Sequence, residues 1–280
     1  MSARRRGMSM TELLIGMVIL AIVGMALTRI MVTQARYFDH QKKSNQARNV
    51  SRGPLNRVVS DIRMVEALGG VVSATSTALS VRVPYAIGVV CTSNSGGGTQ
   101  ISMLPVDSAM YAGPGYFGYA WRDGMGKYHY VDSGTLHDDG DVVACTNAGI
   151  NTLTSQKGYA RRITPSLTDT ASVGTPVMVY RKILYEFKAS SSVPGTIGLW
   201  RTIVANGATE ELSAPYENTA KFRFFIGSAL TAVDPPPANL STLRGIELNM
   251  TGVSERTAEG ATQKERAPFV TAVFFKNRLN

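Results

Sequence analysis

The N-terminus constrains this chain more than any other stretch, because a short basic segment runs directly into a long apolar one. Three arginines at positions 4–6 and then Gly7 come first, and the run from Leu13 to Thr28 contains no charged residue. At 1.5 Å per residue this run covers about 24 Å of helix, and residues 8–11 extend it to the length needed to span a bilayer. The sequence therefore predicts a membrane-spanning helix at about residues 8–33.

Two ordinary kinds of segment begin in the same way. A secretory signal peptide also has a basic start and an apolar core, but it ends in a small-residue cleavage site. Here the core runs into Leu27-Thr28-Arg29-Ile30 without a convincing site. A signal anchor explains the basic start through the excess of positive charge on the cytoplasmic side of membranes, but it leaves Glu12 unexplained. Glu12 is therefore the residue that separates these alternatives.

Glu12 is a carboxylate at the start of an apolar helix. Such a group costs about 2.5–3.5 kcal/mol at mid-bilayer and is usually kept for a pairing function. If a peptidase cuts after Gly7, the new α-amino group of Met8 is a cation about one helical turn from Glu12, and it can face the Glu12 of a neighbouring copy in an assembly. The alternative is that Glu12, near the helix end, simply reaches the membrane interface.

The basic leader, Gly7, the run Met-Ser-Met-Thr-Glu-Leu-Leu-Ile from Met8 and the apolar helix together resemble the type III signal of type IV pilins and pseudopilins. The resemblance implies cleavage between Gly7 and Met8 by a prepilin peptidase on the cytoplasmic side. It also implies N-methylation of Met8 and retention of the helix in the mature protein, where Glu12 would serve assembly. Signals of this family most often have Phe where Met8 stands.

Four short segments further along carry a second resemblance. They resemble PilW-type minor pilins first and J-type pseudopilins next, and they are Asp61-Ile62-Arg63, Gly198-Leu199-Trp200-Arg201, Arg244-Gly245-Ile246-Glu247-Leu248 and Phe275-Lys276-Asn277. The family pattern typically continues Asp-Leu-Arg with Ala-Gly and ends in Leu-Arg-Asn. This chain departs from it at Met64-Val65 and at Phe275-Lys276.

The helix is expected to continue beyond the membrane. Gln34 to Asn49 is polar and contains no glycine or proline, which is typical of a solvated helix. Gly53-Pro54 predicts a kink, or a restart with Pro54 in the first turn. An apolar stripe at helical spacing then predicts a face packed on a sheet, and Gly69-Gly70 is expected to end the helix. The stripe consists of Leu55, Val58, Val59, Ile62 and Val65.

Residues 69–280 show short β-type runs separated by Gly, Ser, Asn and Pro. The most regular predicted strands are Leu79–Val83, Val177–Phe187, Gly198–Val204, Lys221–Ile226, Arg244–Met250 and Phe269–Phe275, with weaker ones at 87–91, 101–104, 116–121 and 128–131. One long helix followed mostly by strands predicts an α+β fold, in which the helix packs on an antiparallel β-rich domain. The expected organisation is a cleaved leader at 1–7, a pilin helix at 8–68 and a periplasmic or extracellular domain at 69–280.

The chain has two cysteines, Cys91 and Cys145, and both lie in the part expected outside the cytoplasm. An even pair in an oxidising compartment favours a disulfide. On the chain-entropy model such a cross-link stabilises the fold by about 4 kcal/mol. The alternative is two independent buried thiols.

The net charge is +9, and loss of the three leader arginines from 29 basic residues leaves 26 against 20 acidic ones, or +6. The basic residues are scattered, with Lys42-Lys43 and Arg161-Arg162 as adjacent pairs. Nucleic-acid binding is typically marked by clustered Lys and Arg with aromatic residues, so we expect no nucleic-acid partner.

The residues that carry chemistry do not form a familiar catalytic motif. The histidines are His40, His129 and His137, and none belongs to an H-E-x-x-H pair or lies beside a cysteine. There is no Gly-x-Ser-x-Gly elbow. We therefore expect no enzymatic activity, although a triad assembled from distant residues is not visible in a sequence.

A carboxylate-rich turn is a weak calcium candidate, because calcium prefers oxygen ligands. It lacks the full D-x-[DN]-x-[DN]-G-x₅-E loop, and the alternative is a solvated turn whose Asp and Gly residues favour hairpin geometry. Otherwise we expect no metal or cofactor. The candidate ligands are Asp132, Asp138, Asp139 and Asp141.

The resemblance implies a minor pilin that takes part in the initiation or assembly of a type IV pilus, with roles in twitching motility or adhesion. Its implied partners are other major and minor pilins, the prepilin peptidase and the bacterial inner membrane, which it would cross once before reaching the pilus or cell surface. The alternative in the same class is a J-type pseudopilin of type II secretion. Alternatives of another class are a DNA-binding competence pilin and a membrane-anchored enzyme.

Overall fold

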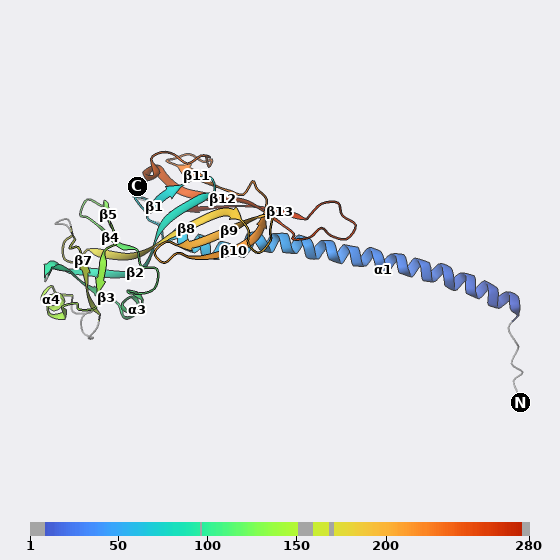
Figure 1. Cartoon of the computed structure of the whole chain (residues 1–280), viewed down its shortest axis with the longest axis horizontal. Helices are drawn as coiled ribbons and strands as arrows, with labels where there is room; N and C mark the ends of the chain where they lie inside the picture. Colours follow the sequence, from blue (N-terminus) through green and yellow to red (C-terminus); the bar gives the residue numbers. More distant parts are fainter. Residues whose placement is uncertain (1–8, 96, 151–158, 168–170, 276–280) are drawn as a thin grey trace, which may run out of the picture.

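A long helix projects from one end of a β-rich domain in the computed structural model, which describes residues 9–95, 97–150, 159–167 and 171–275 (Figure 1). The α+β prediction, with the helix packed on an antiparallel sheet, is confirmed. The elements are α1 (Met10–Arg52), α2 (Leu55–Arg63), β1 (Val71–Ala74), β2 (Ala78–Ser95), β3 (Gly98–Met103), α3 (Pro105–Met110), β4 (Gly118–Arg122), β5 (Tyr128–Asp132), β6 (Thr135–His137), α4 (Val142–Asn147), β7 (Ala160–Thr164), β8 (Pro176–Ala189), β9 (Ile197–Ile203), β10 (Ala208–Tyr216), β11 (Lys221–Ile226), the 3₁₀ helix η1 (Leu240–Thr242), β12 (Leu243–Val253) and β13 (Arg266–Phe274).

The last part of α1 docks on the sheet against β10, β12 and β13. Ala47 and Val50 are buried there. Strand β12 approaches the helix backbone directly, because a Cβ on Gly252 would lie well inside van der Waals contact of the Ala47 carbonyl oxygen and the Ser51 hydroxyl. Only a residue without a side chain allows the strand to run this close to the helix.

The helix breaks at Gly53-Pro54, as its sequence predicts, and Pro54 stands immediately before the first turn of α2. Proline has no N–H to donate to the carbonyl four residues earlier, which is that of Val50. The Val50 carbonyl instead accepts hydrogen bonds from the hydroxyls of Ser213 at 2.8 Å and Tyr216 at 2.7 Å. The break in the helix therefore supplies the acceptor that fixes α1 to β10.

The apolar stripe after the break does pack on the sheet. Val58, Ile62 and Val65 are fully buried in the core. The expected helix end at Gly69-Gly70 is wrong, because α2 ends at Arg63. The backbone N–H groups of residues 64 and 65 bond the carbonyls three residues earlier, and these tighter turns bring Val65 into the core without continuing the helix.

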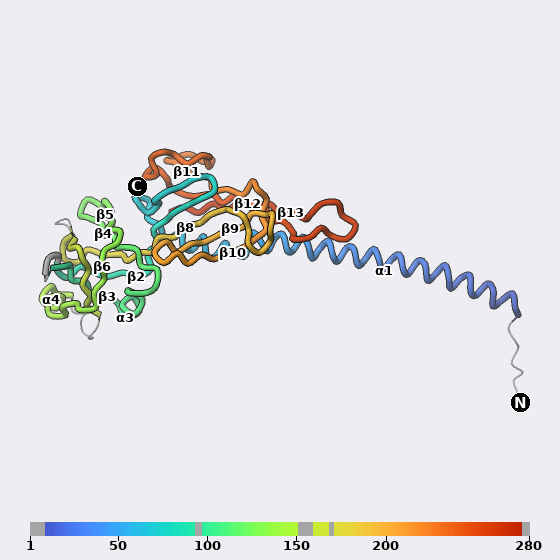
Figure 2. The backbone as a smooth tube through the Cα atoms, in the orientation of Figure 1, coloured from blue at the N-terminus to red at the C-terminus, as the bar shows by residue number. Residues whose placement is uncertain are grey.

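The strands form one antiparallel sheet, which contains 13 strands within the described residues. Its main order is β11-β12-β10-β9-β8-β2-β3-β7-β6, and β1, β4, β5 and β13 pair beside this path. Strands β2 and β8 are the longest, with 18 and 14 residues, and they pair with each other along most of their length. They form the spine that connects the two ends of the domain (Figure 2).

Two apolar cores lie along this spine. The proximal lobe, nearest α1, contains α2, β1, β9–β13 and the adjoining parts of β2 and β8, and its core includes Leu79, Ile183 and Phe222. The distal lobe contains β3–β7, α3, α4 and the other parts of β2 and β8, and its core includes Met103 and Ile163. Figure 1 shows the distal lobe at the end of the molecule opposite the projecting helix.

Candidate functional site: the N-terminal helix

The first turn of α1 is closed by reciprocal hydrogen bonds between Ser9 and Glu12. The Ser9 hydroxyl accepts from the Glu12 backbone N–H at 3.2 Å, and the Glu12 carboxylate accepts from the Ser9 backbone N–H at 3.0 Å. This capping box satisfies two of the backbone donors that a helix start leaves without partners. Glu12 therefore has a local structural role in addition to its charge, and Ser-x-x-Glu is the spacing that is typical of this cap.

The part of α1 beyond this cap is both apolar and exposed. Met10 to Ala35 runs free of the domain over roughly 39 Å at 1.5 Å per residue, and large side chains such as Leu20 and Met31 are 72% and 71% exposed. Among the described residues one helix, which includes α1, is long and apolar enough to cross a membrane. Gly16 and Gly24 lie on this part of the helix with open space beside them.

The loop between β12 and β13, residues 254–265, runs along α1 where the helix enters the domain, and we call it the strap loop (Figure 1). Asp39 accepts a hydrogen bond from the backbone N–H of Glu259 at 2.8 Å. His40 Nδ1 lies 2.9 Å from Glu265, and Arg36 lies 3.8 Å from Glu259. These polar contacts begin just beyond the apolar part of the helix.

Comparison with known protein families adds a direct match at this end of the chain. Residues 2–28 match the prokaryotic N-terminal methylation motif. The chain carries a type IV pilin-like signal. No curated protein and no solved structure matches the chain. The signal and the apolar helix together support a type IV pilin or pseudopilin-like protein that is anchored in a membrane through α1.

The cleavage site between Gly7 and Met8 lies outside the described residues. Glu12 lies inside them, and its carboxylate is held at the backbone N–H of Ser9, the residue that follows Met8. The charge of Glu12 thus lies at the backbone of Ser9, the first described residue. Pairing with the amine of a neighbouring copy stays a prediction.

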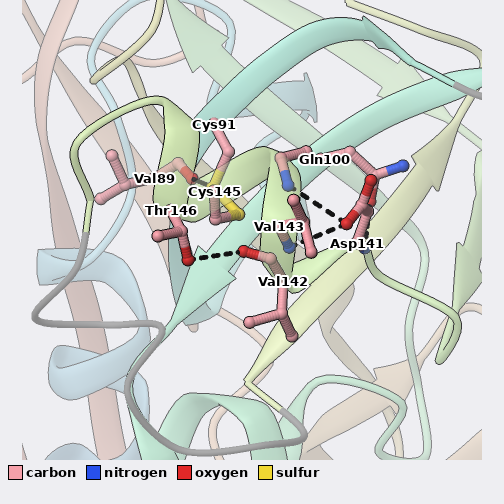
Figure 3. Close-up of a disulfide and its surroundings, with 9 residues drawn as sticks. Val89, Cys91, Gln100, Asp141, Val142, Val143, Cys145 and Thr146 are labelled. Carbon is pink, nitrogen blue, oxygen red and sulfur yellow. Dashed lines mark hydrogen bonds between the residues drawn. A yellow bond between two sulfur atoms is a disulfide. The ribbon is translucent and has the colours of Figure 1, made fainter.

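The cysteines lie far from this helix, in the distal lobe. Cys91 on β2 and Cys145 on α4 form a disulfide with a Cα–Cα distance of 4.6 Å (Figure 3). Helix α4 is positioned by Asp141, whose carboxylate accepts from the backbone N–H groups of Val143 at 2.8 Å and Ala144 at 3.1 Å. The disulfide therefore fixes a capped helical turn to the spine of the sheet.

The four carboxylates proposed as calcium ligands have separate partners. Asp132 bonds Arg82 and the hydroxyl of Tyr180. Asp139 bonds Arg162 at 2.7 Å, Asp138 lies 3.6 Å from Arg161, and Asp141 caps α4. Within the described part of the chain no three His, Cys, Asp or Glu residues form a group that could hold a metal ion. The turn is built from ion pairs and a helix cap. The adjacent arginines Arg161 and Arg162 are the partners of Asp138 and Asp139 in these ion pairs.

Asp132 lies at the junction of the two lobes. Burial opposes ionisation of its carboxyl group, but hydrogen bonds from Arg82 and Tyr180 and the charge of Arg82 outweigh this effect and lower its pKa. Arg82 also donates to the Gly69 carbonyl at 2.6 Å and packs over the Tyr130 ring at 4.5 Å. One ion pair thus ties β2, β5, β8 and the end of the helical region together.

Two of the four short segments that suggested a subfamily meet in space. The Nε of Arg201 on β9 lies 3.2 Å from the carboxylate of Asp61 on α2, which also accepts from the Tyr185 hydroxyl at 2.6 Å. Arg201 is almost fully buried, and burial is the main cause of the raised pKa of Tyr185. This network docks α2 on the sheet. The final segment is only partly described, since Lys276-Asn277 lies outside the described residues.

The remaining candidate residues are two histidines, which contact neighbouring side chains of the distal lobe, and the Lys42-Lys43 pair. His129 Nε2 lies 2.8 Å from Asp123, and its ring stacks on Trp121 at 5.2 Å. His137 Nε2 lies 2.9 Å from the Thr164 hydroxyl. Lys42 and Lys43 line an open groove beside α1 and the strap loop.

Proposed function

We propose that this protein is a minor pilin, most like PilW-type proteins, that helps to initiate or cap a type IV pilus. The observation that carries the proposal is α1, which combines the methylation motif with an exposed apolar surface from Met10 to Phe38. Such a helix leaves a bilayer only for an equally apolar environment, and a bundle of similar helices supplies one. The open space beside Gly16 and Gly24 would let neighbouring helices approach closely.

The domain at 69–280 supports a low copy number, because a subunit of this size is large for dense repetition around a filament. The proposed partners are other major and minor pilins and the prepilin peptidase. The proposed route begins with a single pass through the bacterial inner membrane and ends at the pilus or cell surface, with effects on twitching motility or adhesion. We propose that the protein acts by binding other pilins and that it catalyses no reaction.

Processing is the first step of the proposal. We expect cleavage between Gly7 and Met8 and a methyl group on the new N-terminus. Intact-mass spectrometry of the protein from a host with an active prepilin peptidase should show the loss of residues 1–7 and one added methyl group. A retained leader in such a host would contradict the proposal.

The pairing role of Glu12 is tested with two variants, because the capping box and the charge are separable. Glutamine also forms a capping box at this position, so Glu12→Gln keeps the helix start and removes only the charge, whereas Glu12→Ala removes both. We expect both variants to insert into the membrane and to be incorporated poorly into filaments. Incorporation of Glu12→Gln at the wild-type level would show that the cap, and not the charge, is what matters.

The pilus and the secretion system are distinguished by deletion of the gene. We expect fewer surface pili and reduced twitching, with type II exoprotein export intact, and restoration of both by the wild-type gene. The opposite result, in which export fails and twitching is normal, would assign the chain to the J-type pseudopilins.

A further inference from the structure

A cavity of about 300 Å³ lies where the two lobes meet, between α2, β2, β8, β9 and α3. Its wall includes the buried apolar side chains of Val83 and Ile183 and the more exposed thioether of Met110. The cavity is separate from α1 and from the groove beside the strap loop. Its lining therefore needs an explanation other than assembly through the helix.

Positive charge dominates the lining. Arg57, Arg181 and Arg201 line the cavity, with Asp61 as the acidic member of the set. Arg201 is already neutralised, since its guanidinium lies 3.2 Å from Asp61 and 3.2 Å from Glu210. Among the described residues, the side chains of Arg57 and Arg181 form no ion pair, whereas Arg201 forms two. Two uncompensated guanidinium groups thus share one cavity.

Arg181 is held in a fixed position without a polar partner. Its guanidinium packs 4.3 Å from the centre of the Tyr85 ring, and the Tyr85 hydroxyl donates to the Tyr111 carbonyl at 2.8 Å. Its Nε is buried and has no hydrogen-bond partner. A buried donor without a partner is costly, and almost all such groups in folded proteins are satisfied. Arg181 as a whole is only partly buried and lines the cavity, so its guanidinium can turn a donor toward an acceptor that enters there.

We propose that this cavity binds a small organic anion, whose carboxylate or phosphate group is held by Arg181 and Arg57. A guanidinium presents its donors in a planar fork that matches these two groups, and stacking on an aromatic ring orients the fork. The apolar part of the ligand packs against Val83 and Ile183. Met110 adapts to its shape, because a thioether side chain is flexible and polarisable.

Because the cavity lies between the two lobes, a bound ligand should change the stability of the folded chain. Arg57 lies on α2 in the proximal lobe, whereas Met110 ends α3 in the distal lobe. A ligand in the cavity contacts both lobes and stabilises the folded chain by an amount that rises with the logarithm of the ligand concentration above the dissociation constant. Binding is thus read out both directly and as a rise in the unfolding temperature.

The test uses the full chain in detergent micelles, with benzoate and inorganic phosphate as probes and with sodium chloride at equal ionic strength as the control. Isothermal titration should show saturable binding of benzoate, and both probes should raise the unfolding temperature above the chloride control. Arg181→Met should weaken benzoate binding at least about tenfold, the loss expected for one charge-assisted hydrogen bond. Arg57→Ala should weaken it by a smaller factor.

Arg63→Ala is the matched control, because Arg63 lies exposed on the same helix as Arg57 and does not line the cavity. It should bind benzoate like the wild type. Equal binding in all variants, or no saturable binding beyond the chloride control, would overturn the proposal. If Arg181→Met fails to fold, the exposed position of Arg57 still allows Arg57→Ala and Arg63→Ala to decide the outcome.

Discussion

The two lobes share one sheet but are stabilised in different ways. In the proximal lobe, apolar side chains from α2 and eight of the described strands, such as Ile62 and Phe222, fill a continuous core on which α1 also docks. In the distal lobe the apolar core is smaller, and several loops are tied to it by specific bonds. The disulfide is one of these, and hydroxyl groups of buried or half-buried tyrosines are others.

The tyrosines show how the distal lobe holds its loops. Tyr111, Tyr116 and Tyr119 donate their hydroxyls to backbone carbonyls of His137, Gly134 and Pro165. Burial raises the pKa of all three hydroxyls, so they remain donors at neutral pH. A lobe with short strands and long connections cannot satisfy its backbone groups by ladders alone. It therefore depends on individual tethers, whereas the proximal lobe depends on packing.

The largest loss of stability should follow a substitution in the core of the proximal lobe. Phe222 is fully buried and lies 5.0 Å from the ring of Phe187. Phe222→Ala should lower the free energy of unfolding by about 3–5 kcal/mol, because it removes apolar contacts and leaves a cavity. Urea unfolding of the full chain in micelles measures this, with the exposed Val270→Ala as control. A loss below about 1 kcal/mol would mean that packing does not distinguish this lobe.

A smaller and more local effect should follow removal of the cross-link. The double variant Cys91→Ala, Cys145→Ala should lower the free energy of unfolding by about 2–4 kcal/mol, the usual range for a native disulfide. Hydrogen exchange should accelerate in β3, β7 and α4 and stay unchanged in β11 and β12. Equal acceleration in both lobes would show that they unfold as one unit.

The docking of α1 on the proximal lobe can be tested separately. Gly252→Ala places a methyl group against the Ala47 carbonyl, and backbone cannot move aside as a flexible side chain can. The substitution should lower the free energy of unfolding by about 1–3 kcal/mol. Hydrogen exchange should become faster in the docked part of α1. Gly124→Ala is the matched control, since a Cβ there meets open space. A neutral Gly252→Ala would mean that α1 does not lie this close to β12 in solution.

The smallest effect should appear only at acid pH, at the junction of the lobes. The pKa of Asp132 is lowered in the folded chain from its ordinary value of 3.8. The unfolded chain therefore takes up this proton first as the pH falls, so the stabilisation is complete above about pH 5 and is lost as the pH drops through the lower folded value. Asp132→Asn should reduce stability at pH 7 and make it less sensitive to pH between about 5 and 3. Identical pH profiles for the two proteins would contradict this.

The sequence predicted the packed lobe better than the tethered one. Val177–Phe187 alternates regularly and lies within β8, because a half-buried strand needs that alternation. Strand β10 was missed, since its polar sequence owes its conformation to pairing with β9. The short helices α3 and α4 were also missed, because six residues are too few to show a helical period. The separate strands expected at Leu79–Val83 and 87–91 form the single strand β2, whose pairing register shifts beside Pro84.

The candidate sites also differ in how well the sequence predicted them. The N-terminal signal is contiguous in sequence and was predictable from residue order. The contact between Asp61 and Arg201 joins residues 140 positions apart, so no local pattern could reveal it. The calcium candidate clustered carboxylates in sequence, but the fold gave Asp132 and Asp139 arginine partners from other strands. Proximity in sequence was informative where the chain is one helix, and it misled where loops bring in distant strands.

If α1 moves through a bilayer as proposed, the strap loop makes inward and outward movement unequal. Arg36, Asp39 and His40 are bound to charged residues of the loop, Glu259 and Glu265. Drawing these groups into hydrocarbon would strip their water, at a high cost in free energy. Movement outward leaves these contacts in water, although it draws Glu12 into the hydrocarbon at a cost of about 2.5–3.5 kcal/mol. On the proposed route to the filament, the loop would therefore limit how deeply the helix can sink without adding to the cost of its extraction.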